Sequence, residues 1–209
     1  MSTSQASTPL IAWQRLRAGS EQPRGPVNIH TGAPADERPT AAVFRCADSG
    51  VAPEIVFGQN GGSLVDLSTL GHAVDSGVMG GLEYAVDVLD VPLIVVLGHH
   101  GCGAMREAMR AWNDVDLPKG STRMMVEQAI GSIVRRGAVA DSPESVGAAH
   151  IVETGLSLLE RSPVIAGGVE AGTCGIVCAT TTDRPDGRIR VYATVGAVGE
   201  VADSLMECV

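Results

Sequence analysis

The chain has 209 residues and a net charge of −9 at pH 7, and 44% of its residues are hydrophobic but only 3% aromatic. This length supports one substantial α/β domain with an aliphatic core. The negative charge argues against nucleic acid and anionic membrane surfaces as partners, because binding phosphates needs clustered Lys and Arg. No apolar run approaches the ~20 residues that cross a bilayer, and the first residues lack the pattern of a signal peptide. We therefore expect a cytoplasmic protein.

The first half of the chain alternates between helix and strand. We expect residues 1–8 to be disordered and residues 9–209 to form a single domain. The predicted elements, in chain order, are a helix at 10–18 capped by Gly19, strands at 41–44 and 64–67, a short helix or turn within 51–62, a helix that starts at Asp75 or Ser76, and a strand at 91–97. The last of these strands is apolar at every position, which is typical of a parallel strand covered on both faces.

The second half is mainly helical and ends in two strands. The predicted elements are a helix from Gly103 to Trp112, a helix at 121–136, a helix from Pro143 to about residue 159, and strands at 175–182 and 189–193. Ser142-Pro143-Glu144 is a helix-start signature, with Ser as the cap and Pro at the first position. Asp186-Gly187 indicates a hairpin between the last two strands. The pattern predicts an α/β fold with a mostly parallel central sheet, flanking helices and an antiparallel edge strand.

Residues that bind metals follow two of these strands. Cys46 and Asp48 come directly after the strand at 41–44, and His99 and Cys102 lie in the glycine-rich turn after the strand at 91–97. Because ligands of open parallel sheets bind beyond the carboxyl ends of the strands, we expect these side chains to meet. Two thiolates, an imidazole and a carboxylate suit Zn²⁺, and three firm ligands leave a fourth position for chemistry. The alternative is that the cysteines are small buried hydrophobes and His99 a hydrogen-bonded turn residue.

Four segments carry a more specific signal: Cys46–Ser49, Glu54–Phe57, Leu82–Val86 and Leu97–Ala104. In this order they resemble the β-class carbonic anhydrases, and the resemblance runs over nearly the whole chain, from Trp13 to Glu200. It implies that the zinc ligands are Cys46, His99 and Cys102, and that Asp48 is either a fourth ligand or the residue that orients a zinc-bound hydroxide. It further implies reversible hydration of CO₂ to bicarbonate, with Asp48 as the catalytic carboxylate. It also implies a homodimer or a dimer of dimers with interlocked N-terminal helices.

Three positions depart from the pattern of that family. Where the family has an arginine that pairs with the Asp48 carboxylate and leaves the fourth position to water, this chain has Gly50. Where the family usually has a glutamine and an arginine, it has Glu37 and Ser68. Without the arginine, Asp48 gains by binding the metal, which would close the site. Arg45 is a candidate replacement cation, although strand alternation points it away from the metal ligands.

Three functions therefore remain open: a CO₂ hydratase of reduced activity, a hydrolase of a CO₂ analogue such as COS or CS₂, and an inactive zinc-binding homologue in which Asp48 closes the site. The other histidines and cysteines are expected to be bystanders. His100 is interpreted as an exposed turn residue, His72 as a hydrogen-bonded loop residue, Cys174 and Cys178 as free thiols, and Cys208 as an incidental thiol near the C-terminus.

Overall fold

The central element of the structure, a computed structural model that describes residues 7–22, 38–181 and 189–199, is a five-stranded sheet. The strands are β1 (Ala41–Cys46), β2 (Leu64–Thr69), β3 (Leu93–His99), β4 (Gly175–Thr181) and β5 (Ile189–Val195). Their order in the sheet is β2-β1-β3-β4-β5. Neighbouring strands are parallel except β5, which is antiparallel to β4. The predicted fold class is confirmed.

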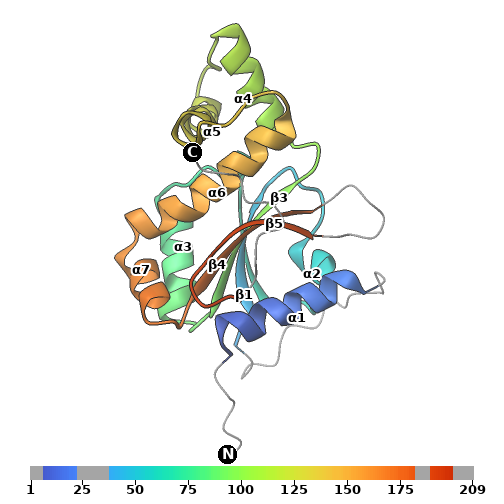
Figure 1. The fold of residues 1–209 in the computed structure, drawn as a ribbon, viewed down its shortest axis with the longest axis vertical. Helices are drawn as coiled ribbons and strands as arrows, with labels where there is room; N and C mark the ends of the chain where they lie inside the picture. The colour runs from blue at the N-terminus through green and yellow to red at the C-terminus, as the bar shows by residue number, and fades with distance from the viewer. Residues whose placement is uncertain (1–6, 23–37, 182–188, 200–209) are drawn as a thin grey trace, which may run out of the picture.

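Helices cover both faces of this sheet and extend beyond one end of it. They are α1 (Pro9–Glu21), α2 (Pro53–Val56), the 3₁₀ turn η1 (Leu70–His72), α3 (Ser76–Asp87), α4 (Gly103–Asp114), α5 (Thr122–Arg136), α6 (Pro143–Arg161) and α7 (Pro163–Glu170). In Figure 1, α1 and α2 lie on one side of the sheet, α3, α6 and α7 on the other, and α4 and α5 beyond its end. Within the described part of the chain, none of the helices has the length and apolar character to cross a membrane.

Strand β3 lies at the centre of the sheet and is buried on both faces. Ile94 and Val96 point into a cluster formed with α3, α6 and α7, whereas Leu93 and Val95 point into a second cluster with Trp13 of α1. All five side chains are at most 1% exposed. This two-sided burial is why residues 93–97 are all apolar. It also fixes the carboxyl end of β3, where the candidate metal ligands begin.

The helices of the structure differ in part from the predicted ones. The N-terminal helix does not end at Gly19 but continues to Glu21. Glycine is needed at position 19 because the backbone of Phe57 lies close to it. A Cβ there would lie 2.0 Å from the backbone oxygen of Phe57. Helix α7 was not predicted. The antiparallel pairing of the last two strands is confirmed, while the turn containing Asp186-Gly187 lies outside the described residues, as do residues 1–6 of the expected N-terminal tail.

Candidate metal centre

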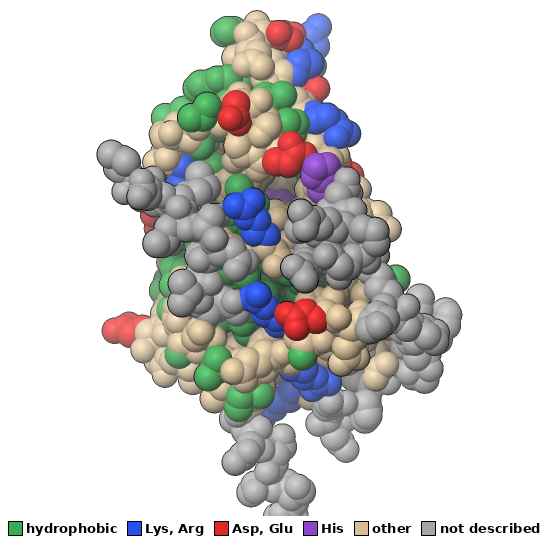
Figure 2. All heavy atoms as spheres, turned by 45° about the vertical axis from the view of Figure 1, so that its right-hand side comes forward, with side chains coloured by type: hydrophobic (Ala, Val, Ile, Leu, Met, Phe, Trp, Pro, Cys, Tyr) green, Lys and Arg blue, Asp and Glu red, His purple; other side chains and the backbone are tan. Residues whose placement is uncertain are grey.

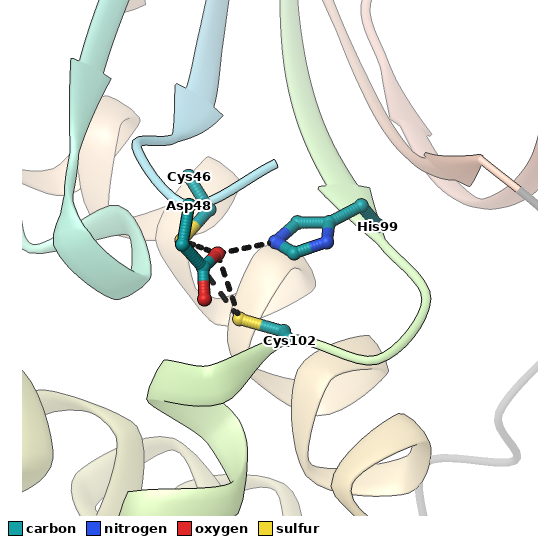
Figure 3. Close-up of side chains that lie close together, drawn as sticks. All are labelled: Cys46, Asp48, His99 and Cys102. Atoms are coloured by element: carbon teal, nitrogen blue, oxygen red, sulfur yellow. Dashed lines mark hydrogen bonds and ion pairs between the residues drawn. The ribbon is translucent and has the colours of Figure 1, made fainter. Parts of the chain in front are cut away.

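The sheet topology brings the four candidate ligands together. β1 ends at Cys46 and β3 at His99, and these strands are parallel neighbours, so both residues reach the same edge. Asp48 lies in the turn after β1, and Cys102 is the residue before α4. Figure 3 shows their side chains converging from these segments. Their ligand atoms all lie within 4.8 Å of one another.

The separation of the two sulfurs fits a tetrahedral metal ion. The two sulfur atoms of Cys46 and Cys102 are 3.8 Å apart, and a tetrahedral zinc with Zn–S bonds of about 2.3 Å would separate its two sulfurs by about 3.8 Å. Asp48 Oδ1 lies 2.9 Å from Cys46 Sγ, 2.7 Å from His99 Nε2 and 3.7 Å from Cys102 Sγ. The carboxylate oxygen thus lies at hydrogen-bonding distance from Cys46 and His99, beside the two sulfurs (Figure 3).

The charges at the site favour a cation. Contact between the sulfurs raises the pKa of Cys46, with burial adding to the effect, and lowers the pKa of Cys102. The pKa of His99 is raised by its contact with Cys46 and by the Asp48 carboxylate. For Asp48 the largest influence is burial, which raises its pKa, but hydrogen bonds from Cys46 and from the Gly103 backbone outweigh it and lower the pKa overall. Two sulfurs and a carboxylate therefore face one another across the site, and a divalent cation bound between them would stabilise their ionised forms.

Two backbone contacts orient the ligand side chains. The Nδ1 atom of His99 lies 3.0 Å from the carbonyl oxygen of His100, which leaves Nε2 directed at the other ligand atoms. Such a contact on the far nitrogen is typical of metal-binding histidines. The backbone N–H of Gly103 donates to Asp48 Oδ2 at 2.8 Å. Asp48 is therefore held by a backbone amide at one oxygen while its other oxygen faces the donor set.

One of the positions that depart from the family pattern, Gly50, lies two residues after Asp48. Gly50 has a φ of +62°, and a Cβ added there would meet nothing within 4 Å. Arg45 forms a two-point pair with Asp66 at 2.9 Å for each hydrogen bond, and its Nη1 also donates to Ser49 Oγ at 3.3 Å. Ser68 lies opposite Arg45 in the register of β1 and β2 and is exposed. Glu37 lies outside the described residues. The carboxylate that Arg45 pairs with is therefore that of Asp66.

A cavity of about 280 Å³ opens beside the candidate ligands and is lined by His99, Cys102, Met105, Ile151 and Tyr192 among others. Two more histidines border it. His72 is 3% exposed and hydrogen-bonds through Nε2 to the carbonyl oxygen of Leu97, which confirms its interpretation as a hydrogen-bonded residue. The side chain of His100 is 47% exposed and lies 3.5 Å from Glu144, so its interpretation as an exposed turn residue is also confirmed.

Two other described cysteines are not among the candidate ligands. Cys174 and Cys178 are buried free thiols, as expected, and burial raises their pKa values to about 11 and about 12. Cys208 lies outside the described residues. Sequence reasoning missed two contacts, the backbone N–H of Gly71, which donates to Cys46 Sγ, and the buried His150 beside it. Neither is marked by a local motif, because both contacts join segments distant in sequence.

Comparison with known proteins agrees with the fold and the site. The family model for carbonic anhydrase matches residues 41–189. A carbonic anhydrase of Mycolicibacterium smegmatis is 41% identical over 204 residues, which cover 93% of this chain and 98% of the relative. Carbonic anhydrase 2 of Mycobacterium tuberculosis is 40% identical over 204 residues, which cover 93% of this chain and 98% of that relative.

Solved structures share the fold at lower identity. A β-carbonic anhydrase of Coccomyxa, in complex with acetazolamide, superposes with a TM-score of 0.65 at 22% identity, covering 78% of this chain and 76% of that one. One of two tetrameric β-carbonic anhydrases of Sordaria macrospora gives a TM-score of 0.62 at 19% identity, covering 77% and 84%. On the family model, the long alignments and this shared fold, the chain belongs to the β-class carbonic anhydrase family.

Proposed function

We propose that this protein catalyses the reversible hydration of CO₂ to bicarbonate at a zinc ion held by Cys46, His99 and Cys102. The observation that carries the proposal is the convergence of these donor atoms with Asp48 at one edge of the sheet, at the sulfur separation that tetrahedral zinc requires. The alignment with mycobacterial carbonic anhydrases over 93% of the chain supports the same reaction. Zinc supplies, when bound, a water ligand whose pKa is lowered to near 7.

In this proposal Asp48 controls access to the fourth position. Its Oδ2 accepts the Gly103 N–H, and its Oδ1 contacts Cys46 and His99. If Oδ1 left those contacts, the carboxylate would leave room for water beside the three other ligands and could accept a hydrogen bond from it, which would orient that water. CO₂ is small and apolar and needs no covalent activation. The cavity beside His99, with Met105 and Ile151 in its wall, gives it an apolar place to dock.

A specific observation favours a second candidate, an inactive zinc-binding homologue. Asp48 Oδ1 contacts both Cys46 and His99, and Gly50 offers no side chain to draw it away. A zinc ion with four protein ligands is closed, which is the arrangement of structural sites. The two candidates share three ligands and differ only in whether Asp48 leaves the metal.

Stopped-flow measurement of CO₂ hydration separates the two candidates. Zinc-loaded protein is compared with metal-stripped protein and with zinc-treated Cys102→Ala as a matched control for the loss of one ligand. The first candidate predicts hydration above the uncatalysed rate by the zinc-loaded protein alone. A zinc-loaded protein that holds one equivalent of zinc and shows no hydration at any pH refutes the hydratase and supports the closed site.

We further propose that the protein is a homodimer or a dimer of dimers in the cytoplasm. The Sordaria structure is described as tetrameric, which supports assembly within the family. On α1, Trp13 is buried in this chain's own core, but Leu10 and Ile11 are 38% and 52% exposed and offer an apolar surface. Light scattering after size exclusion is expected to give two or four chains, and Ile11→Glu is expected to lower that number. A monomeric wild type would refute the assembly.

A further inference from the structure

A backbone amide outside the ligand set contacts one of the site's sulfurs. The N–H of Gly71, in η1, donates to Cys46 Sγ with an N to S distance of 3.1 Å. A hydrogen bond to a thiolate withdraws electron density from the sulfur and fixes the direction in which it binds a metal. The orientation of this one residue therefore influences how Cys46 meets a metal ion.

Helices α4 and α5 hold the turn that carries Gly71. Its φ of +59° is a left-handed conformation, and a Cβ there would lie 2.6 Å from Met125 Cγ and 2.9 Å from Ala104 Cβ. Only glycine satisfies both conditions. Just beyond the turn, Gln128 of α5 accepts the backbone N–H of Val74 at 2.9 Å and donates to its carbonyl oxygen at 3.3 Å. The turn is therefore packed and hydrogen-bonded from α5.

Helix α6 contacts the carbonyl oxygen of the same glycine. His150, which is 2% exposed, places Nε2 at 2.8 Å from the carbonyl oxygen of Gly71 and Nδ1 at 2.8 Å from Ser132 Oγ. A carbonyl oxygen only accepts hydrogen bonds, so Nε2 must carry the hydrogen. Burial lowers the pKa of His150, and with the hydrogen on Nε2 the Nδ1 atom faces Ser132 Oγ as an acceptor. The Ser132 hydroxyl, which has a single hydrogen, also lies 3.0 Å from the carbonyl oxygen of Gln128. The contacts form an ordered chain from Ser132 through His150 and Gly71 to Cys46.

We propose that Ser132 and His150 are positioning residues of the metal centre, which lock Gly71 so that its N–H stays on Cys46 Sγ. Neither side chain touches the donor atoms, and their effect passes through the conformation of Gly71. The proposal rests on the proposed metal site. It assigns a function to a buried histidine 51 residues beyond the ligand His99 in the chain.

Cobalt(II) substitution of the full-length protein tests the proposal, because the thiolate-to-cobalt absorption band reports the electron density on sulfur. In His150→Phe, which keeps a ring but loses the N–H, we expect about 10-fold weaker cobalt binding and a shift of the band to lower energy. In His150→Gln, whose amide nitrogen can still donate to Gly71, we expect wild-type affinity and band position. Ile165→Ala on α7, a buried residue in a different cluster from Cys46, controls for general loss of stability.

A second readout needs no metal. Hydrogen exchange of the Gly71 amide in metal-free protein is expected to be about 10-fold faster in His150→Phe than in wild type, and unchanged in Ile165→Ala. If His150→Phe does not fold, Ser132→Ala replaces it as the milder variant, with the same directions expected. An unchanged band, affinity and Gly71 exchange in the folded variant would overturn the proposal. A wild type that binds no cobalt through sulfur would instead refute the metal site, and the amide exchange would still decide the role of His150.

Discussion

The substitution Gly50→Arg tests how Asp48 controls the site. A side chain at this position has open space, since a Cβ would meet nothing within 4 Å. The φ of +62° is the obstacle, because a non-glycine residue in the left-handed region costs about 1–2 kcal/mol. We therefore expect the free energy of unfolding to fall by about 1–2 kcal/mol, with no cost from steric clash.

The functional effect is expected to have the opposite sign. A guanidinium at position 50 would pair with Asp48, whose Oδ1 now lies 2.7 Å from His99 Nε2, and draw this oxygen out of the donor set. Since a positioned acid–base group contributes about 10²–10⁴ in rate, restoring the position of Asp48 is expected to raise kcat for CO₂ hydration by about 10²-fold. Stopped-flow kinetics and urea denaturation on the same zinc-loaded samples measure both effects.

The matched control is Gly50→Gln, which carries the same backbone strain without the charge. It is expected to lose the same stability and to gain no activity. Equal rates in the wild type and Gly50→Arg would show that Asp48 does not obstruct the fourth position in this protein. An equal gain in Gly50→Gln would assign the effect to the loop conformation and contradict the argument from charge.

Other predictions concern the buried groups. Burial, followed by the neighbouring His150, lowers the pKa of His72 to about 3, below its unfolded value of 6.5. The unfolded state therefore binds more protons between these two values, so stability is complete above pH 6.5 and lost as pH falls toward 3. The loss from His72 is about 2 kcal/mol between pH 6.5 and 5. When urea denaturation is repeated across this range, the total loss should shrink by that amount in His72→Gln, while the part due to His150, whose pKa burial also lowers, remains. Cys174 and Cys178, whose pKa values burial raises, should resist iodoacetamide at pH 8 in the folded protein and react in urea; labelling of the native protein would contradict this. Gly155→Ala, whose Cβ would lie 2.5 Å from Cys178 Sγ, should lower stability by about 1–3 kcal/mol. Gly80→Ala, which meets nothing within 4 Å, should raise it by about 0.5–1 kcal/mol; equal changes in the two would refute the packing argument.

The fold and the ligand positions could be predicted because both are expressed in local patterns. The uninterrupted apolar run of β3 reports burial on two faces, and a parallel sheet places the residues that follow its strands at one edge. Cys46 and His99 meet for that reason. A usable signal was overlooked for α7, because Ser162-Pro163 repeats the helix-start pattern found at Ser142-Pro143, and Ser162 caps α7 through the N–H of Ile165.

Other features have no local signature. Gly19 looks like a helix cap in the sequence but is required by the backbone of Phe57, which another segment brings within 2.0 Å of its Cβ position. The contact between His150 and Gly71 joins residues 79 apart and depends on how α6 packs over the turn after β2. Such roles follow from tertiary contacts and could not be predicted from periodicity or spacing.

The surface gives little sign of a charged partner on the face in Figure 2, where the described basic side chains lie among acidic and hydrophobic ones rather than in one stripe. This mixture agrees with the net charge of −9. A small neutral substrate such as CO₂ requires no such stripe, since it reaches its site without electrostatic attraction.

A crystal structure of the zinc-loaded protein, with anomalous diffraction to locate the metal, tests the central claim most directly. The account predicts one zinc ion at about 2.3 Å from the sulfurs of Cys46 and Cys102 and about 2.0–2.1 Å from His99 Nε2, with Asp48 Oδ1 or water as the fourth ligand. Zinc bound elsewhere, or a site in which either cysteine sulfur stays off the metal, would contradict it.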